Sequence, residues 1–352
     1  MECVMKKYTV SASSVYDVLI GRGLLADAGR YLAELYTPRH ISVITDSTVN
    51  GKYSQVLMTS LMEHGFRPSK ILFPAGEHSK NLTTYANILE ALAEDCISRS
   101  DLLIALGGGV VCDLAGFVAG TYMRGIDYIV IPTTLQAAID TAIGGKAAIN
   151  LNAGKNLAGV FWQPSLVLCD PGTFQTLPEP QIIDGLAEAV KCAAISDAGL
   201  VPKILDRDLD YVVERCISIK KSLVEVDERD TGLRQLLNFG HTAAHGIEKL
   251  SAYNISHGRA VAKGMIAEAR GAWRMGLAKA DISGDLTEIF ASLGITPDIP
   301  FSARDLYEHA LKDKKIRDNR INMIIPESLG KCTLRRISFT ELSELLRLGV
   351  EA

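Results

Sequence analysis

DLLIALGGGVVCDLAGFVAG, residues 101–120, carries the strongest signal for the fold of this 352-residue chain. Its first six residues, apolar after Asp101, are typical of a buried strand, and Gly107, Gly108 and Gly109 separate them from a helix-like run of small and apolar residues. Backbone N–H groups at such a strand-to-helix turn can bind a phosphate, and the helix dipole favours its negative charge. The spacing is not G-x-G-x-x-G, so a tight turn without a ligand is the alternative.

Strand-like and helix-like runs alternate around this stretch. Alternation of apolar and polar residues at 8–20 predicts a strand pair, and further strands are expected at 40–45, 71–73, 101–106, 128–131 and 166–169. Helices are expected between them at 24–35, 53–64 and 83–97. Strands separated by helices pair in parallel through right-handed crossovers, so this half of the chain is predicted to be an α/β domain with a Rossmann-like parallel sheet.

The character of the sequence changes after residue 169. Asp-Pro-Gly at 170–172 and Leu-Pro-Glu-Pro at 177–180 interrupt the chain, and helical periodicity dominates beyond them. Helices are expected at 182–195, 211–227, 242–250, 260–275, 283–293, 303–311 and from 340, with a strand pair at 321–326 and 332–336. We therefore expect two domains, 1–178 and 179–352, of which the second is mainly α-helical.

The composition argues against several classes of protein. The 41 acidic and 37 basic residues give a formal charge of -4 without long single-sign runs, which indicates no nucleic-acid surface. We expect no membrane segment, because no apolar stretch reaches about 18 residues, and no signal peptide at the first residues. The seven cysteines are odd in number and lack C-x-x-C spacing, which favours a reduced, cytoplasmic setting.

Three histidines lie close together in the sequence. His241 and His245 are four apart in a predicted helix and share a face, and His257 follows a turn-rich segment. Imidazoles from a helix and a returning loop suit a metal such as zinc, and spacing alone favours His241 with His245 as ligands. A surface pair, or buried histidines with satisfied hydrogen bonds, is the alternative.

Several charged and polar residues precede these histidines. Glu188 and Lys191 share one helix face in an apolar run, and they form either an intrahelical ion pair or, through Glu188, the oxygen ligand of the histidine site. Lys220, Arg234 and Asn238 lead into the histidine stretch. Arg234 and Asn238 are four apart, so they could face the same pocket as the histidines.

Two glycine-lysine steps in the first domain suggest anion binding. They lie at 144–146 and 154–156, after Asp140, where a flexible backbone and a lysine could bind phosphate or carboxylate. Ordinary surface lysines are the alternative. Asp46 follows a predicted strand and either accepts a hydrogen bond from a ribose or caps the next helix.

Seven motifs follow one another along the chain: ALGGGVVCDLAGFVAGTYMRG, IPTT, GGKAAIN, GKN, GLAEAVK, DERDTGLRQLLNFGHT and SHGRAVAKGM. In this order and spacing they resemble the 3-dehydroquinate synthases, sugar-phosphate cyclases with a glycerol-dehydrogenase-like fold, over nearly the whole chain. The resemblance implies an NAD- and metal-dependent lyase of the shikimate pathway that converts 3-deoxy-D-arabino-heptulosonate 7-phosphate to 3-dehydroquinate and phosphate. It places NAD on domain 1–178, metal and substrate on 179–352, and the active site in the interdomain cleft.

The resemblance also assigns residues. It implies Zn²⁺, or Co²⁺, held by Glu188, His241 and His257, and it moves His245 to the substrate. It implies NAD contacts from Asp46, Glu77, Lys80, Gly108, Gly109, Val110, Asp113, Thr133, Thr134, Lys146, Lys155, Thr173, Phe174, Gln175 and Thr176. It implies substrate contacts from Arg124, Asp140, Lys146, Asn156, Lys191, Lys220, Arg234, Asn238 and His245, with Lys146, Lys191, Asn238 and His245 handling protons. Arg124 would reach the substrate of a neighbouring subunit, which implies a homodimer, and a lysine of 313–315 would contact substrate.

Departures from the family pattern and rival functions remain. Cys112 stands where the family usually has glycine, Arg259 where it usually has glutamate, and 136–148 is unusual around Asp140 and Lys146. One rival is a 2-deoxy-scyllo-inosose or 2-epi-5-epi-valiolone synthase, whose substrate lacks the carboxylate. Others are a metal-dependent polyol dehydrogenase and a non-catalytic NAD-binding or metabolite-sensing protein. Retention of the expected carboxylate-facing residues and of every proposed ligand favours the dehydroquinate reaction.

Overall fold

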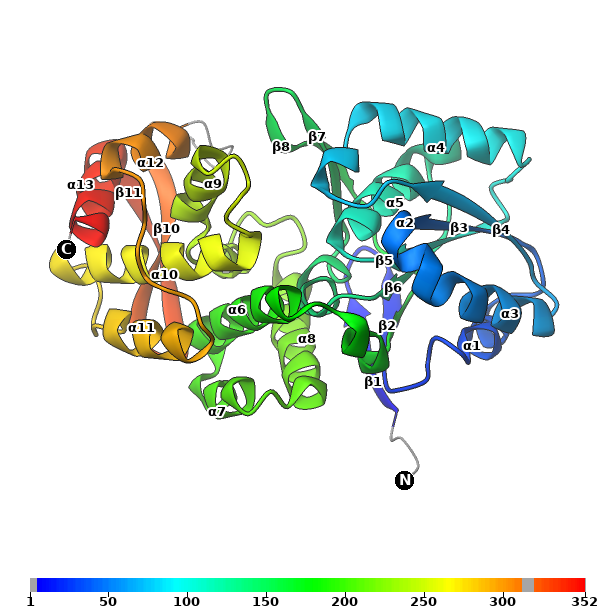
Figure 1. The fold of residues 1–352 in the computed structure, drawn as a ribbon, viewed down its shortest axis with the longest axis horizontal. Coiled ribbons are helices and arrows are strands. Elements are labelled where there is room, and N and C mark those ends of the chain that lie inside the picture. Colours follow the sequence, from blue (N-terminus) through cyan, green and yellow to red (C-terminus); the bar gives the residue numbers. More distant parts are fainter. Residues whose placement is uncertain (1–4, 312–319, 352) are drawn as a thin grey trace. The chain divides into compact units, whose positions relative to one another are not determined.

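The computed structural model describes residues 5–311 and 320–351, and the chain forms two compact units, Met1–Leu177 and Pro178–Ala352 (Figure 1). The first unit contains a seven-stranded sheet in the order β1-β2-β9-β6-β5-β3-β4. Its strands are β1 (Lys6–Ser11), β2 (Val15–Ile20), β3 (His40–Asp46), β4 (Arg67–Phe73), β5 (Leu102–Gly107), β6 (Tyr128–Pro132) and β9 (Leu166–Cys169). β1 and β2 pair antiparallel and the other neighbours pair in parallel, which confirms the predicted Rossmann-like sheet.

Helices cover the central strands of this sheet on both faces. Every residue of β5 is buried, as expected for a parallel strand between two helix layers. Leu102, Ile104 and Leu106 join the apolar core shared with α1 (Ala28–Leu35) and α3 (Gln55–Glu63). Alternate residues of a strand point to the opposite face, where α5 (Gly109–Thr121) packs on β5 and β6. The other helices of the unit are α2 (Ser47–Val49), η1 (Asn50–Ser54), η2 (Glu77–Ser79), α4 (Leu82–Glu94), η3 (Tyr122–Arg124), η4 (Ala137–Thr141) and η5 (Pro171–Thr176).

A β-hairpin, β7 (Lys146–Leu151) and β8 (Gly154–Phe161), is the main element of this unit that the sequence did not predict. The reason is its composition, since β7 and β8 carry alanine and glycine where strands usually carry β-branched residues. Small residues are required because β7 packs on α5: a Cβ on Gly116 would lie 2.8 Å from the Cβ of Ala147. The first predicted helix also starts later than expected, at Ala28 after a series of turns.

The second unit is mainly helical, as predicted, and includes one strand pair. Its elements are α6 (Glu179–Ser196), η6 (Ala198–Leu200), α7 (Val201–Leu205), α8 (Leu209–Val226), η7 (Leu233–Asn238), α9 (His241–Leu250), α10 (His257–Arg274), α11 (Ser283–Ser292), α12 (Ala303–Ala310), β10 (Arg320–Ser328), β11 (Lys331–Ser338) and α13 (Phe339–Val350). Helix α10, yellow in Figure 1, packs against α6, α9, α11 and α13. It begins three residues before the predicted start. Within the described ranges, no helix is both long and apolar enough to cross a membrane.

Two glycines let α10 approach its neighbours closely. A Cβ on Gly258 would lie 2.4 Å from the carbonyl oxygen of Asp184 in α6. A Cβ on Gly264 would lie 2.1 Å from the carbonyl oxygen of Gly240, just before α9. Any side chain at these positions would therefore push α10 away from α6 or α9.

We predict that Gly264→Ala lowers the free energy of unfolding by about 1–3 kcal/mol, because the added methyl group must displace the Gly240 carbonyl. Urea denaturation measures the change. Gly284→Ala in α11 is the matched control: nothing lies within 4 Å of its added Cβ, so this variant should be as stable as the parent or up to about 1 kcal/mol more stable. Equal stability of both variants would contradict the close approach.

Candidate functional site

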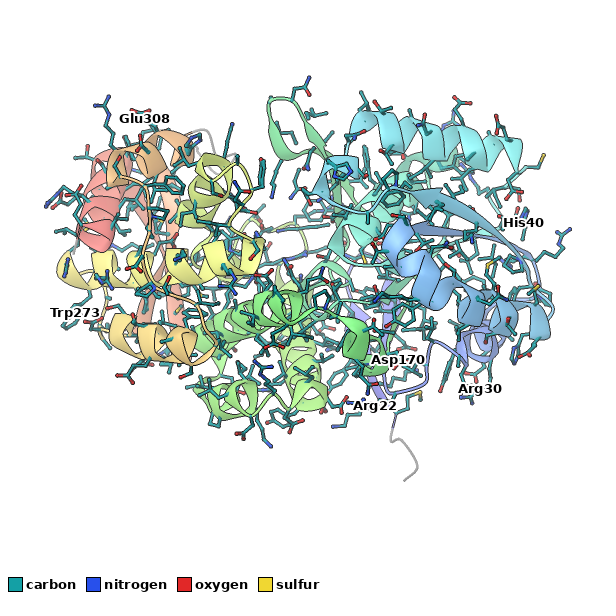
Figure 2. All side chains as sticks on the ribbon, in the orientation of Figure 1. Arg22, Arg30, His40, Asp170, Trp273 and Glu308 are labelled. Carbon is teal, nitrogen blue, oxygen red and sulfur yellow. The ribbon has the colours of Figure 1, made fainter. Side chains whose placement is uncertain are left out.

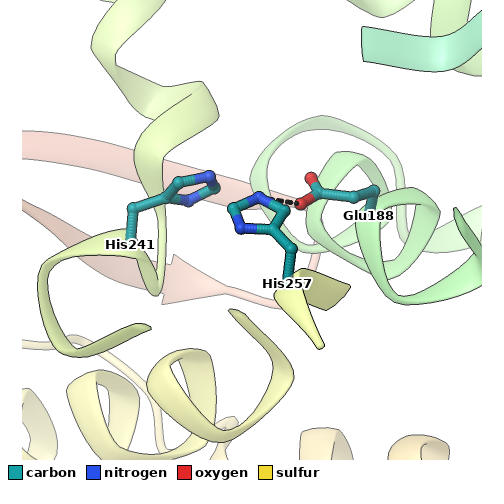
Figure 3. Close-up of side chains that lie close together, drawn as sticks. All are labelled: Glu188, His241 and His257. Carbon is teal, nitrogen blue, oxygen red and sulfur yellow. Dashed lines mark ion pairs between the residues drawn. The ribbon is translucent and has the colours of Figure 1, made fainter. Parts of the chain in front are cut away.

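Glu188, His241 and His257 come together in the second unit (Figure 3). One ligand atom from each lies within 4.8 Å of the others, with Glu188 and His241 buried and His257 partly exposed. The rings of His241 and His257 have centroids 5.3 Å apart. His245 is exposed and, although its ring centroid is 5.7 Å from that of His241, it is not part of this group. The cluster thus contains the residues implied by the family resemblance rather than the pair favoured by helical spacing.

Packing of α10 on α6 brings His257 to Glu188. His257 is the first residue of α10, and the next residue, Gly258, lies against the backbone of Asp184. The Ser256 hydroxyl donates to Asp184 Oδ1 at 2.6 Å. Asp184 is one helical turn before Glu188, so these contacts set the start of α10 beside the carboxylate.

A buried carboxylate from α10 fixes the start of α9, where His241 is the first residue. Gly240 has φ 82°, a left-handed conformation suited to glycine, and its N–H donates to Glu268 Oε2 at 3.0 Å. The Ala243 N–H donates to Glu268 Oε1 at 3.1 Å. A carboxylate at a helix N-terminus satisfies orphan N–H groups and complements the helix dipole. Glu268 therefore holds the turn that carries His241.

Charges of opposite sign alternate through the cluster. Lys191 Nζ donates to Glu188 Oε2, and both side chains are buried. Glu188 Oε1 lies 3.2 Å from His257 Nε2, the ion pair drawn in Figure 3, and His257 Nδ1 lies 3.3 Å from Glu248 Oε1. Burial lowers the pKa of His257, but its contacts with the two carboxylates outweigh burial and raise that pKa to about 10.

The donor set suits a catalytic metal. Two imidazoles and one carboxylate are a ligand set of catalytic zinc sites, in which three protein ligands leave a coordination position open. The ion pair expected from the spacing of Glu188 and Lys191 is present, and it uses only one carboxylate oxygen. The other oxygen faces His257, so Glu188 can make the ion pair and also belong to the metal group.

Other predicted substrate residues of the second unit lie in α8 and η7. Lys220 is buried in α8, and Arg234 is buried in η7, where its Nη1 donates to the Glu228 carbonyl at 2.6 Å. Asn238 is the last residue of η7. Because η7 is a 3₁₀ helix, in which residues three apart eclipse, the four-residue spacing of Arg234 and Asn238 does not give them a common face. The predicted lysine of 313–315 lies outside the described residues.

The residues expected to contact NAD follow the carboxyl ends of the parallel strands. Asp46 ends β3, Glu77 and Lys80 follow β4, Gly108 to Val110 follow β5, Asp113 lies in α5, Thr133 and Thr134 follow β6, and Thr173 to Thr176 follow β9. This edge is where open α/β sheets bind nucleotides. Gly108 is the N-cap of α5. Because glycine has no side chain, this residue cannot accept hydrogen bonds from the first N–H groups of the helix through a side chain.

Hydrogen bonds hold two of these segments in place. The Asp46 side chain accepts hydrogen bonds from the N–H groups of Thr48 and Val49. It therefore caps the next helix, which is one of the two roles that the sequence suggested for this residue. Asp170, labelled in Figure 2, accepts from the N–H of Leu25 at 3.1 Å through Oδ2. The Tyr53 hydroxyl donates to the Thr173 carbonyl at 2.7 Å. The turn after β9 is therefore tied to two other segments of the unit.

Lys80, a predicted NAD residue, contacts a second predicted NAD residue and a predicted substrate residue. Its buried Nζ donates to the carboxylate of Asp113 and, at 2.6 Å, to Oδ1 of Asn156 in β8. Burial raises the pKa of Asp113 although Lys80 lowers it. The Asn156 N–H donates to Asn150 Oδ1 at 3.0 Å, and its φ of 52° is left-handed. These bonds fix the turn end of the hairpin to α5.

The remaining predicted residues lie elsewhere in the first unit. Arg124 is exposed in η3, Asp140 lies in η4, Lys146 is the exposed first residue of β7, and Lys155 lies in β8. Cys112 is buried in α5, where burial raises the pKa of its thiol, so it is a neutral packing residue. In the second unit, Arg259 Nη1 donates to the Gly294 carbonyl at 3.3 Å.

Sequence reasoning missed the supporting carboxylates Glu248 and Glu268. Glu248 stands seven residues after His241 in α9, a spacing of two helical turns that places both on one face. Glu268 is an acidic residue within a helix of small apolar residues. Both carboxylates could have been noticed in the sequence. A carboxylate on an apolar helix face is expected to be buried, and a buried carboxylate needs a hydrogen-bonding partner.

We predict that Glu268→Gln lowers the free energy of unfolding by about 1–3 kcal/mol, because the amide nitrogen that replaces one oxygen cannot accept from Gly240 or Ala243. Urea denaturation of the metal-free protein measures it. Glu308→Gln is the control, since Glu308, labelled in Figure 2, is exposed and its substitution should change stability by less than about 0.5 kcal/mol. Equal stabilities of the two variants would argue against the anchoring role of Glu268.

Comparison with known proteins relates this fold and cluster to one enzyme family. The chain matches the family models described as 3-dehydroquinate synthase N-terminal, over residues 70–184, and 3-dehydroquinate synthase C-terminal, over residues 185–316. It is 40% identical over 355 residues to a 3-dehydroquinate synthase of Streptococcus suis (strain 05ZYH33), covering 97% of this chain and 100% of the relative. A 3-dehydroquinate synthase of Clostridium acetobutylicum is 39% identical over 347 residues, covering 95% and 96%.

Similar solved structures include other cyclases. A 2-deoxy-scyllo-inosose synthase complexed with carbaglucose-6-phosphate, NAD+ and Co²⁺ has a TM-score of 0.87 and 26% identity over 97% of this chain and 99% of that chain. A 2-epi-5-epi-valiolone synthase from Streptomyces hygroscopicus subsp. jinggangensis 5008, with NAD+ and Zn²⁺ bound, has a TM-score of 0.86 and 28% identity over the same shares. A glycerol dehydrogenase from Schizosaccharomyces pombe, at 15% identity, a TM-score of 0.68 and coverage of 100% and 92%, shares the fold. From the two family models and the full-length relatives, the chain belongs to the 3-dehydroquinate synthase family.

Proposed function

We propose that this protein catalyses the 3-dehydroquinate synthase reaction, the conversion of 3-deoxy-D-arabino-heptulosonate 7-phosphate to 3-dehydroquinate and phosphate. The reaction is a phosphate-eliminating cyclisation in which transient oxidation, elimination, re-reduction and an internal aldol closure follow one another. It belongs to the shikimate pathway of aromatic amino-acid biosynthesis. The full-length identity to 3-dehydroquinate synthases supports this assignment. The structural observation that carries it is the group of Glu188, His241 and His257. Lys191 forms an ion pair with the Oε2 atom of the Glu188 carboxylate.

NAD and a divalent metal, Zn²⁺ or Co²⁺, are the proposed cofactors. The two similar cyclase structures contain NAD+ with Co²⁺ or Zn²⁺, and the two imidazoles and one carboxylate of this chain suit the same ions. When bound, the metal would polarise substrate hydroxyls and NAD would take up and return a hydride. The edge of the sheet after β3, β5, β6 and β9 is the proposed NAD site.

Charged residues of this chain suit the two anionic ends of the substrate. Lys146, Lys220 and Arg234 are proposed to bind its carboxylate and phosphate, since lysine and arginine make strong charge-assisted hydrogen bonds to such groups. Burial of Lys220 and Arg234 strengthens those bonds by excluding water. Asp140 and Asn156 would orient the substrate hydroxyls. The reaction would thus depend on positioning and electrostatics from both units.

Proton handling is proposed for Lys146, Lys191 and His245 as acids or bases and for Asn238 as a hydrogen-bonding partner. Lys191 Nζ is held against Glu188, so it can donate to a substrate oxygen next to the metal group. His245 is exposed one helical turn beyond His241, so its imidazole is accessible to a bound substrate. Asn238 cannot titrate and would hold a substrate oxygen through its amide.

The first test supplies the zinc-loaded protein with NAD and the heptulosonate phosphate. We expect phosphate and 3-dehydroquinate in equal amounts and no net absorbance of NADH, because the hydride returns within each turnover. Glucose 6-phosphate, a sugar phosphate without the carboxylate, is the control and should release no phosphate. Accumulating NADH would indicate a dehydrogenase, turnover of glucose 6-phosphate would indicate a sister cyclase, and no phosphate release from the heptulosonate would reject the assignment.

The second test separates metal binding from proton transfer. We predict that His257→Ala loses bound zinc and activity together while its circular dichroism spectrum is unchanged. His245→Ala is the matched control: it should retain zinc and lose activity by about 10²–10⁴-fold, the usual contribution of a general acid or base. Zinc content by atomic absorption and initial rates are the measurements. Full activity in His257→Ala would remove this residue from the ligand set.

A homodimer in the cytoplasm is proposed as the working state of the enzyme. Arg124 is exposed and its φ of 66° is a conformation that non-glycine residues rarely adopt, which suits a residue held out towards a neighbouring subunit. Six described cysteines are free thiols, in keeping with a reducing compartment. Light scattering during gel filtration would give the mass, and a monomer in active fractions would refute the dimer.

A further inference from the structure

We propose that Glu248 is a positioning residue of the metal centre, whose carboxylate accepts the Nδ1–H of His257 and thereby turns Nε2 of that ring towards the metal. Glu248 is 3% exposed, and its Oε1 lies 3.3 Å from His257 Nδ1. The inference rests on the metal-dependent function proposed above. It adds a residue to the site that is neither a metal ligand nor a substrate contact.

The two nitrogens of His257 face two different carboxylates. Nε2 lies 3.2 Å from Glu188 Oε1, and Nδ1 lies on the side of Glu248. Glu188 is in the metal group, and Nε2 is the His257 nitrogen beside its carboxylate, so Nε2 is the nitrogen placed to share an ion with Glu188. A neutral imidazole carries one proton, and the hydrogen bond made by one nitrogen decides which of the two is the donor. Glu248 would therefore keep the proton on Nδ1 and leave the lone pair of Nε2 for the metal.

His241 has the same arrangement with a weaker acceptor. Its Nδ1 lies 3.3 Å from the carbonyl oxygen of Phe239. Both histidines thus have a hydrogen-bond acceptor beside Nδ1, and the acceptor beside His257 is a carboxylate. A carboxylate acceptor orients the ring and also raises the basicity of the ligating nitrogen, and loss of such a partner typically weakens metal binding.

The position of Glu248 is itself fixed by α9. It lies two helical turns after His241, so the helix that carries one ligand also carries the residue that orients the other. The Glu248 carbonyl accepts from the Tyr253 N–H at 2.8 Å and from the Ser251 hydroxyl at 3.0 Å, which closes the end of the helix. A buried carboxylate is costly without a partner, and Glu248 has His257 Nδ1 as a partner.

The experiment compares zinc affinity of the intact protein with that of Glu248→Ala and Glu248→Gln by chelator competition. We expect the alanine variant to bind zinc about 10–100-fold more weakly, the usual effect of removing the partner of a ligating histidine. The glutamine variant keeps an oxygen acceptor of the same reach, so it should recover most of the affinity. Cobalt-loaded protein gives a second measurement, since the absorption spectrum should change in the alanine variant and return towards that of the parent in the glutamine variant.

Two controls separate this effect from a loss of stability. Glu308→Ala removes an exposed carboxylate from α12 and should leave zinc affinity unchanged. Leu286→Ala removes a fully buried side chain from α11, so it should destabilise the fold while the folded protein binds zinc as tightly as the parent. Unchanged zinc affinity and cobalt spectrum in Glu248→Ala would overturn the proposal.

A measurement on the parent protein covers the case in which Glu248→Ala does not fold. In the zinc-loaded protein, ¹⁵N NMR of His257 should show a protonated Nδ1 and a metal-bound Nε2. Metal-bound Nδ1 would overturn the role of Glu248. A parent protein that binds no zinc would instead reject the metal dependence of the proposed function, so the two failures are distinguishable.

Discussion

Helix α10 touches α6 and α9 backbone to backbone, at Gly258 and Gly264. The contact exists because neither position carries a side chain, and the flanking residues of α10 are mostly buried and small. Helix packing normally keeps axes about 8–10 Å apart, with side chains setting the separation. Here the helix separation determines the geometry of the candidate metal group. It fixes the distance of His257, at the start of α10, from the other candidate ligands on α6 and α9. The same helix supplies Glu268, which fixes the start of α9, so one element positions both neighbours.

The cost of this arrangement is a row of charged groups of which three, Lys191, Glu188 and Glu248, are buried. Lys191, Glu188, His257 and Glu248 alternate in sign, and each contacts the next. Buried ion pairs seldom stabilise a fold relative to apolar packing, because desolvation offsets the attraction between the charges. The apolar cores of the two units must therefore provide the stability of the fold. The carboxylates of the charged row favour a divalent ion, whereas Lys191 limits their combined negative charge.

Sequence patterns predicted the elements that depend on local residues and failed where distant contacts decide. The buried strands at His40–Asp46 and Leu102–Gly107 were predicted, because continuous apolar runs are specific for a parallel sheet. The hairpin was missed because its alanines and glycines, which are unusual in strands, are required by close packing of β7 on α5. The early start of α10 was missed because contacts of Ser256 and Gly258 with Asp184 fix it. The cluster of Glu188 with His257 joins residues distant in sequence, so helical spacing pointed to His241 with His245, whereas the family motifs implied the group that the structure assembles.

The candidate ligands and their supporting residues all come from one compact unit, between Asp184 and Glu268. The glycine-rich turn after β5 and the other strand ends belong to the other unit. Selection can therefore act on the two halves of the gene separately: a substitution that alters the strand ends leaves untouched the packing that assembles the histidines. The strand ends and the histidine cluster can thus be altered one at a time within the same fold.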